Sequence, residues 1–170
     1  MKGSAHLAMG ICAGAITACA VPDNLYGAAF MGGCIIGSIL PDIDLATSKI
    51  GHLTTPIAIL LNKIFGHRGF IHTPICSLLF ALLFGAIAHA ITPDNAVHVA
   101  AGVFFGCMLH LLQDTFTKNG IRWLYPLPFK IHFTNIKSNN PICYLITIAL
   151  IVLYFVMCDT NPNIANFLIA

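Results

Sequence analysis

Charged residues are scarce in this chain, and glutamate is absent altogether. Only 8% of its 170 residues are charged, whereas a soluble domain carries roughly 25%. So few charges cannot cover a surface that faces water, which excludes an ordinary soluble domain. The hydrophobic fraction of 58% and the mean hydropathy of +0.86 instead predict an integral membrane protein. The net charge of +2, without any block of like charges, gives no sign of a nucleic-acid partner.

Paired cysteine motifs are also missing. None of the seven cysteines forms a CxxC, and all of them lie within or at the ends of apolar stretches. A buried cysteine behaves as a small hydrophobic side chain. The pattern therefore indicates neither a disulfide framework nor a thiolate metal site.

Long apolar runs, in contrast, recur along the whole chain. They predict an all-α fold, an integral membrane helical bundle with about five spans in a single domain over residues 1–170. The five stretches cover residues 6–21, 25–40, 73–91, 96–112 and 141–158. The first two are shorter than the roughly 20 apolar residues that a span usually needs. Turn-forming residues at 22–24 and 92–95 predict that the first four stretches form two helical hairpins.

The basic residues predict the orientation, because cytoplasmic loops of membrane proteins are enriched in Lys and Arg. All eight lie before the first stretch or in the two long loops, residues 41–72 and 113–140. The hairpin turns and the carboxy-terminal tail contain none. We therefore expect the amino terminus and both long loops in the cytoplasm and the carboxy terminus outside.

One apolar segment, residues 53–65, is too short to cross the membrane. Its larger apolar residues recur at helical spacing and are Leu53, Ile57, Leu60, Leu61 and Ile64. The pattern fits a short amphipathic helix in the membrane interface, and it equally fits a loop helix packed on the bundle.

Histidines and aspartates gather at the ends of the stretches that this orientation places at the cytoplasmic surface. They are His6, Asp42, Asp44, His67, His72, His110 and Asp114. Ionisable side chains near membrane depth are costly, so a converging set is expected to have a function. Imidazole favours transition metals and carboxylate favours harder ions. We expect this set to bind one or two divalent ions, most simply Zn²⁺ or Mn²⁺. His89 and His98 fall toward the opposite surface and are not expected to bind metal.

The spacing within each motif supports this hypothesis and leaves alternatives open. His110 and Asp114 share one helix face, so both can bind one ion, or the aspartate can orient the imidazole. Asp42 and Asp44 would repel each other without a cation between them, although a solvated turn is the simpler explanation of two aspartates beside a proline.

His67 and His72 flank a glycine, Gly69, whose backbone freedom would let both imidazoles face one point. Arg68 cannot bind a metal, but its guanidinium is suited to holding a phosphate through two hydrogen bonds. Alternatively, the histidines are interfacial polar residues and Arg68 is only a charge on the cytoplasmic side. His6 is isolated on an apolar face and, taken alone, would be a structural histidine.

The order of the motifs resembles that of a known family. The motifs that carry the resemblance are, in order, an early histidine, PDxD at 41–44, HRGxxHT at 67–73, HxxxD at 110–114 and GxxxxYP at 120–126. Through them the chain resembles the YdjM-like family. Its members are described as LexA-regulated, membrane-bound, metal-dependent hydrolases of the bacterial inner membrane. The resemblance covers about residues 4–129 and leaves 141–158 as an additional span. It implies that the seven His and Asp residues named above form the metal site.

A more distant similarity, through HxxxD, is to zinc-dependent phospholipase C and related nucleases, and it implies phosphoester chemistry by analogy. We therefore expect metal-assisted hydrolysis of an amphipathic phosphoester or lipid headgroup at the cytoplasmic membrane surface. Asp44 or Asp114 would act as general base and Arg68 would hold the anion. The alternatives are a non-catalytic metal-binding membrane protein, a small transporter, or a structural protein with an incidental polar face. The apolar middles of the spans disfavour transport.

Overall fold

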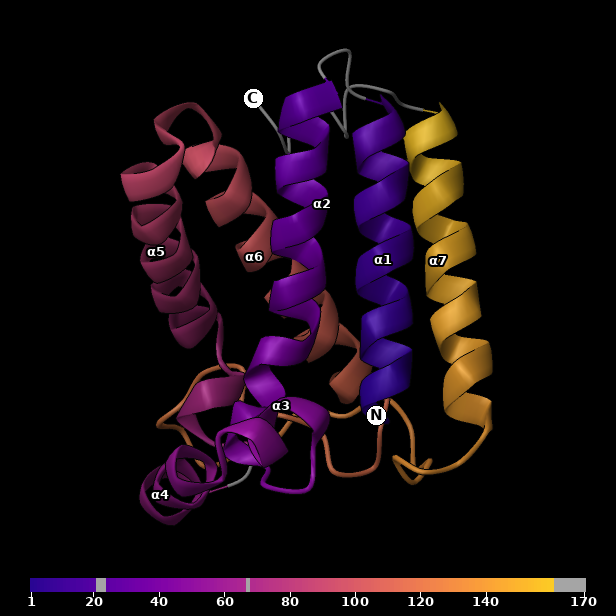
Figure 1. The fold of residues 1–170 in the computed structure, drawn as a ribbon. Helices are drawn as coiled ribbons and strands as arrows, with labels where there is room; N and C mark the ends of the chain where they lie inside the picture. Colours follow the sequence, from indigo (N-terminus) through magenta and orange to yellow (C-terminus); the bar gives the residue numbers. More distant parts are fainter. Residues whose placement is uncertain (21–23, 67, 161–170) are drawn as a thin grey trace.

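The computed structural model describes residues 1–20, 24–66 and 68–160 of the chain (Figure 1). Within these ranges the regular structure is helical, and the only β-type pairing is a single bridge between Ile121 and Ile131. The predicted all-α membrane bundle is confirmed. Its long helices are α1 (Gly3–Ala20), α2 (Asn24–Ile39), α5 (Pro74–Ile91), α6 (Ala96–Thr115) and α7 (Ile142–Thr160). Part of the predicted turn at 22–24 lies outside the described residues.

Among the described residues, four segments are long and apolar enough to cross a membrane. They are Tyr26–Asp44, Pro74–Ile91, Pro93–Thr115 and Ile142–Thr160, and each overlaps one of the last four predicted spans. The first predicted span corresponds to α1, a shorter apolar helix that runs beside α2 and α7 (Figure 1). In the described part of the chain, the bundle thus combines these four segments with α1, whose apolar stretch Gly3–Cys19 is slightly shorter than a span.

Glycines bring α2 and α6 into backbone contact. A Cβ added at Gly37 would overlap the carbonyl oxygen of Val103, and one added at Gly106 would overlap that of Cys34. Small residues permit this close approach between membrane helices. Because α2 leads directly to Asp42 and α6 carries His110, the crossing holds the two halves of the predicted metal site together.

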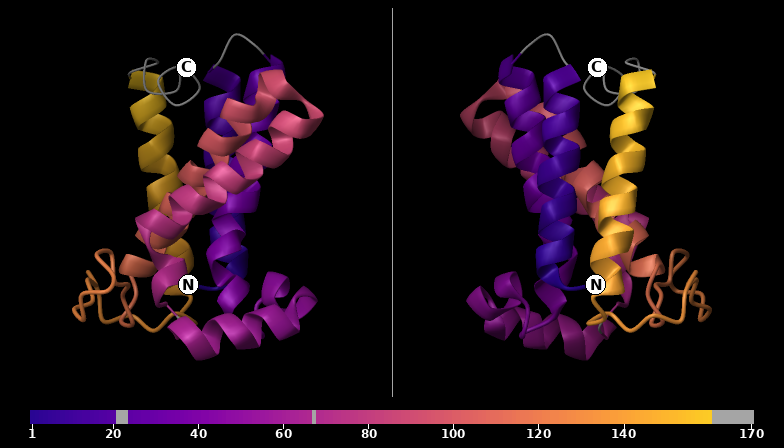
Figure 2. Two further views of the ribbon diagram at one scale, coloured as in Figure 1. Left: turned by 90° about the vertical axis from the view of Figure 1, so that its left-hand side faces the viewer. Right: turned by 90° about the vertical axis from the view of Figure 1, so that its right-hand side faces the viewer.

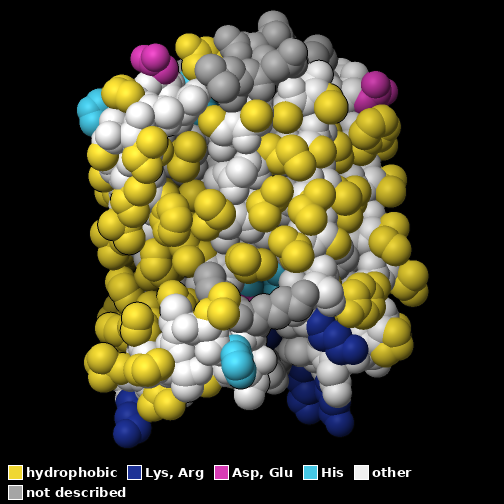
Figure 3. All heavy atoms as spheres, viewed as in Figure 1, with side chains coloured by type: hydrophobic (Ala, Val, Ile, Leu, Met, Phe, Trp, Pro, Cys, Tyr) yellow, Lys and Arg dark blue, Asp and Glu magenta, His cyan; other side chains and the backbone are white. Residues whose placement is uncertain are grey.

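The outer surface of the bundle is apolar. Large hydrophobic side chains are exposed along α5 and α7, among them Leu78, Leu82, Leu83, Leu145, Ile148 and Phe155. On the face seen in Figure 3, these apolar side chains form a broad band, with Lys and Arg at its lower edge and Asp at its upper edge. Such a band is the surface that a lipid bilayer covers.

Two short helices lie across one end of the bundle, α3 (Lys49–Leu53) and α4 (Thr55–Phe65) (Figures 1 and 2). The predicted apolar stripe faces outward, because Leu53, Ile57, Leu60 and Ile64 are between 52% and 84% exposed. The buried residue of α4 is the small Ala58. This exposure favours the interfacial helix over a helix packed on the bundle through its stripe.

The same end of the bundle carries the long loop between α6 and α7, on the other side from α3 and α4 (Figure 2). The loop is tied to α6 by the indole Nε1 of Trp123, which donates to Thr115 Oγ1 at 3.0 Å. It is tied to itself by the bridge between Ile121 and Ile131. The predicted metal site lies between these two flanking elements.

Candidate metal centre

Five of the seven predicted site residues come together at this end of the bundle. His6 is in the first turns of α1, and Asp42 is in the 3₁₀ helix η1 (Leu40–Asp44) that continues α2. His72 ends the 3₁₀ helix η2 (Phe70–His72), which precedes α5, while His110 and Asp114 occupy the last turns of α6. All five side chains are buried. We refer to His6, Asp42, His72, His110 and Asp114 as the inner cluster.

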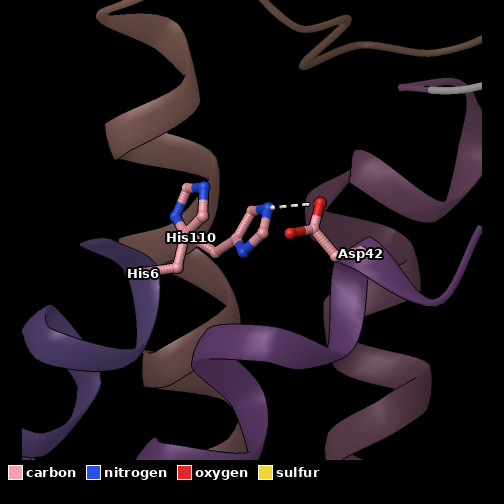
Figure 4. Close-up of side chains that lie close together, drawn as sticks. All are labelled: His6, Asp42 and His110. Atoms are coloured by element: carbon pink, nitrogen blue, oxygen red, sulfur yellow. Dashed lines mark ion pairs between the residues drawn. The ribbon is translucent and has the colours of Figure 1, made fainter. Parts of the chain in front are cut away.

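The potential ligand atoms of the inner cluster lie within reach of a single ion. His110 Nε2 is 3.7 Å from Asp42 Oδ1 and 3.8 Å from Asp114 Oδ2 (Figure 4). His72 Nε2 is 4.0 and 3.9 Å from the same two oxygens. Zinc–ligand distances of about 2.0–2.2 Å place two ligand atoms on one ion no more than about 4.4 Å apart. These separations are therefore compatible with coordination after little movement.

Within the described ranges, two overlapping groups of three residues have ligand atoms that all lie within 4.8 Å of one another. One group contains His6, Asp42 and His110, and the other contains His72, His110 and Asp114. Figure 4 shows the first group, in which three separate elements direct their side chains toward one point. The rings of His6 and His110 are stacked, with centroids 3.7 Å apart. His110 belongs to both groups and is the central residue of the cluster.

Hydrogen bonds determine which nitrogen of His110 and His6 faces the cluster. His110 Nδ1 lies 2.8 Å from the carbonyl oxygen of Ser38. Since a carbonyl only accepts, Nδ1 carries the proton, and the lone pair of the neutral ring is on Nε2. His6 Nδ1 lies 3.0 Å from Gln113 Oε1. The Gln113 amide nitrogen donates to the Ala5 carbonyl and to Thr147 Oγ1, so its oxygen must accept from His6.

The two lone pairs are left without a hydrogen-bond donor. Among the described residues, neither His6 Nε2 nor His110 Nε2 has a hydrogen-bond partner, although both atoms are buried. A buried polar atom without a partner is uncommon and calls for an explanation, such as an ion. Metal-binding histidines almost always donate their other nitrogen to an oxygen outside the site, as both rings do here. The donor set therefore has the form of a metal site.

Asp44 differs from the sequence-based expectation. Its Oδ2 lies 3.6 Å from Nδ1 of His72 and accepts the backbone N–H of Arg68 at 3.2 Å, so it faces the side of the imidazole remote from Nε2. Residues two apart in a 3₁₀ helix point about 120° apart, which is why Asp42 and Asp44 do not face the same point. Asp44 is placed to orient His72 rather than to bind the same ion.

Arg68 also differs from the expected free anion-binding group. Its guanidinium is buried, with Nη2 2.9 Å from Asp114 Oδ2 and Nη1 donating to Thr117 Oγ1 at 3.0 Å. Asp114 additionally accepts from the amino group of Met1. Arg68 has a φ of 60°, in the left-handed region. Such backbone conformations are costly for a residue other than glycine and concentrate at functional sites.

His89 and His98, which were not expected to bind metal, are separate from the inner cluster. His67 lies outside the described residues, so its predicted role as a ligand stays a prediction. His98 stacks on Tyr26, with centroids 4.2 Å apart, and His89 is exposed near the far end of α5. Neither belongs to the ligand groups found in the described part of the chain. Sequence reasoning missed Gln113, although a polar residue in an apolar helix is itself a functional signal.

Comparisons with known proteins identify a family and several relatives. The family described as "YdjM inner membrane protein" matches residues 1–170. The uncharacterized protein YvsG of Bacillus subtilis is 31% identical over 134 residues, which cover 77% of each chain. The inner membrane protein YdjM of Escherichia coli is 31% identical over 106 residues, 57% of this chain and 52% of that protein. The aligned region thus spans about half the length of this relative.

The inner membrane protein YdjM of Shigella flexneri matches with the same identity and coverage. No solved structure gives a significant match. The family match extends over the whole chain, and the helices of spanning length fit a protein that crosses the inner membrane several times. The chain belongs to the YdjM family of inner membrane proteins.

Proposed function

We propose that this protein is a membrane-bound, metal-dependent hydrolase whose inner cluster holds one or two divalent ions, Zn²⁺ or Mn²⁺. The observation that carries the proposal is the pair of buried Nε2 atoms of His6 and His110, which have no hydrogen-bond partner among the described residues and lie beside the carboxylates of Asp42 and Asp114. Three imidazoles with two carboxylates suit transition metals of this kind. A bound ion would lower the pKa of a bound water and polarise the scissile group.

Two features favour catalysis over a purely structural metal. A structural zinc site is usually closed by four protein ligands, whereas the inner cluster offers five side chains. In addition, the side chain of Asp42 is 11% exposed, so water can reach one edge of the cluster. Asp114 is paired with Arg68 and Asp44 faces away, which leaves Asp42 as the carboxylate best placed to accept a proton from water.

The position of the site supports a lipid headgroup or another amphipathic phosphoester as the substrate. The inner cluster lies where α1 begins, where η1 continues α2 and where α6 ends. This is the end of the bundle that carries α4 and the long loop (Figure 2). That level corresponds to the lipid headgroups if the apolar band is the part that the bilayer covers. A phosphoester in a headgroup or in another amphipathic molecule would meet the cluster there without entering the bilayer core.

The hydrolase is expected to cleave phosphoesters only when metal is bound. Detergent-purified protein should hydrolyse at least one member of a panel of phospholipids, phosphodiesters and amphipathic esters. Chelator should abolish this activity, and added Zn²⁺ or Mn²⁺ should restore it. Asp42→Asn should lower turnover by more than about 100-fold, since one general base contributes about 10²–10⁴-fold. Metal-loaded, folded protein that is inert toward the whole panel would support a metal-binding protein instead.

We further propose that the site faces the cytoplasm. All eight basic residues lie before the first apolar stretch or in the two long loops, on the same side as the site residues, and cytoplasmic loops are enriched in Lys and Arg. Single cysteines introduced at Lys63 and Lys137 should react with a membrane-impermeant maleimide only after the cells are opened. A cysteine at Asp94, in the turn between α5 and α6, should react in intact cells. Cys19→Ser provides the background, because Cys19 is the exposed native cysteine. Labelling of all three positions from the same side would refute this orientation.

A further inference from the structure

Asp42 is the residue through which the inner cluster is accessible to solvent. The side chains of His6, His72 and His110 have no exposed surface, and that of Asp114 is 1% exposed. The side chain of Asp42 is 11% exposed. Anything that reaches the cluster in this structure must therefore approach along Asp42.

A cavity of about 320 Å³ opens at this edge. Residues 1–4 at the start of α1 form one wall, and Asp42, Leu45, Thr47 and Ser48 form the other. Its volume is at the lower end of the range for small-molecule sites, about 300–1,000 Å³. The cavity is therefore suited to a group of headgroup size that rests against Asp42.

A second cavity, of about 270 Å³, lies beside Asp44 and Lys63. It does not offer a route to the cluster, because the side chain of Asp44 is completely buried. Asp44 also faces the outer nitrogen of His72 rather than the ligand atoms. The first cavity is thus the better candidate for the substrate.

The lining of the first cavity includes one basic side chain, Lys2. Its Nζ lies 5.9 Å from the centre of the Tyr144 ring, within range of a cation–π contact. The hydroxyl of Tyr144 is in turn 2.9 Å from Ser4 Oγ. Lys2 and Ser4 line the cavity, whereas Tyr144 lies outside the lining, so the ammonium of Lys2 would turn from Tyr144 toward the cavity to bind a phosphate as a point charge. Arg68 is unsuited to this task, since its guanidinium already pairs with Asp114.

We infer that this cavity is the substrate site and that Lys2 binds the anionic group of the substrate there, a phosphate in the simplest case. The inference rests on the proposed hydrolase function and names the route and the recognition group for it. The anion would lie between Lys2 and the exposed edge of Asp42, next to the metal. Recognition of the substrate anion then depends on Lys2, which is not one of the proposed metal ligands, and on a cavity that stays open at Gly3.

Gly3 allows the route to be blocked without altering a ligand. A Cβ added there would meet Asp42 Oδ2 at 4.0 Å, so the backbone position tolerates a side chain that points toward the cavity. Gly3→Leu should fill the opening and keep the metal. Gly32→Leu is the matched control, because a Cβ at Gly32 meets nothing within 4 Å and lies on the exposed side of α2. Lys2→Ala has two controls. Lys2→Arg keeps the positive charge, and Lys130→Ala removes an exposed lysine that does not line the cavity.

The test uses protein loaded with Mn²⁺, whose paramagnetism accelerates the ³¹P relaxation of inorganic phosphate bound beside it. We expect wild type to show this effect. Gly3→Leu, which blocks access, and Lys2→Ala, which removes one charge-assisted contact, should each weaken phosphate binding about tenfold or more. Lys2→Arg, Gly32→Leu and Lys130→Ala should bind as wild type does. Metal content, measured in parallel, should be the same in all variants.

Three outcomes would overturn the inference. Undiminished relaxation in Gly3→Leu, or in Lys2→Ala, would show that phosphate reaches the metal by another route or is held by another group. Absence of the effect in wild type that still hydrolyses a substrate would refute anion binding while the hydrolase function stands. Failure of the hydrolase proposal itself appears separately, as metal-loaded protein without turnover.

Discussion

Replacing His110 with alanine is expected to remove most of the metal from the purified protein. His110 belongs to both ligand groups, and its Nε2 lies between the carboxylates of Asp42 and Asp114. Even residues that only support a ligand cost about 10–100-fold in metal affinity when they are changed, so loss of a central ligand should cost at least that much. Element-specific analysis of detergent-purified protein, dialysed against a fixed free-metal concentration, measures the effect.

His98→Ala is the matched control for this experiment. His98 lies on the same helix, α6, but near its other end, where its ring stacks on Tyr26. This variant should retain the metal content of wild type. If both variants lose metal equally, or if His110→Ala remains loaded, the inner cluster is not the metal site.

Arg68→Ala is expected to destabilise the metal-free protein by about 3–5 kcal/mol, the usual cost of removing one partner of a buried ion pair. Asp114 would lose the guanidinium 2.9 Å from its Oδ2 and would keep the Met1 amino group as its remaining cationic partner in a buried position. Thermal unfolding in detergent measures the difference. Bound metal should reduce the loss, because a divalent ion supplies positive charge next to the same carboxylate.

Lys63→Ala removes an exposed basic residue of the same loop and should leave the unfolding temperature nearly unchanged, since exposed charges contribute little. Arg68 was expected from the sequence to hold a substrate anion. If Arg68→Ala left stability intact and raised only the KM, that expectation would be right and the structural role would be wrong.

The sequence predicted the helices and the position of the site well because both depend on strong, local signals. Apolar runs of nearly spanning length leave few alternatives to membrane helices. The one-sided basic residues then placed His6, Asp42, His72 and His110 at the same end, where the structure brings them together. This prediction used only the positions of residues along the chain and did not require knowing which distant segments are in contact.

The roles of Asp44 and Arg68 could not be predicted in the same way. Whether Asp42 or Asp44 faces the histidines depends on the turn angle of η1, a 3₁₀ helix that the sequence does not specify. The direction of the Arg68 side chain depends on its left-handed φ and on its hydrogen bond to Thr117, a residue 49 positions further along the chain. Such long-range partners are determined by the packing of the whole bundle.

The backbone contact between α2 and α6 has a consequence for biogenesis. The amino-terminal hairpin supplies His6 and Asp42, whereas the later hairpin supplies His72, His110 and Asp114. During synthesis, the first hairpin would enter the bilayer with only part of the ligand set. The group of His6, Asp42 and His110 takes ligands from both hairpins, so it is complete only after the second hairpin has docked against the first through the glycines. If an ion binds all five residues of the inner cluster, its full coordination would be a late step of assembly, and the ion would stabilise the contact between two hairpins that are inserted one after the other.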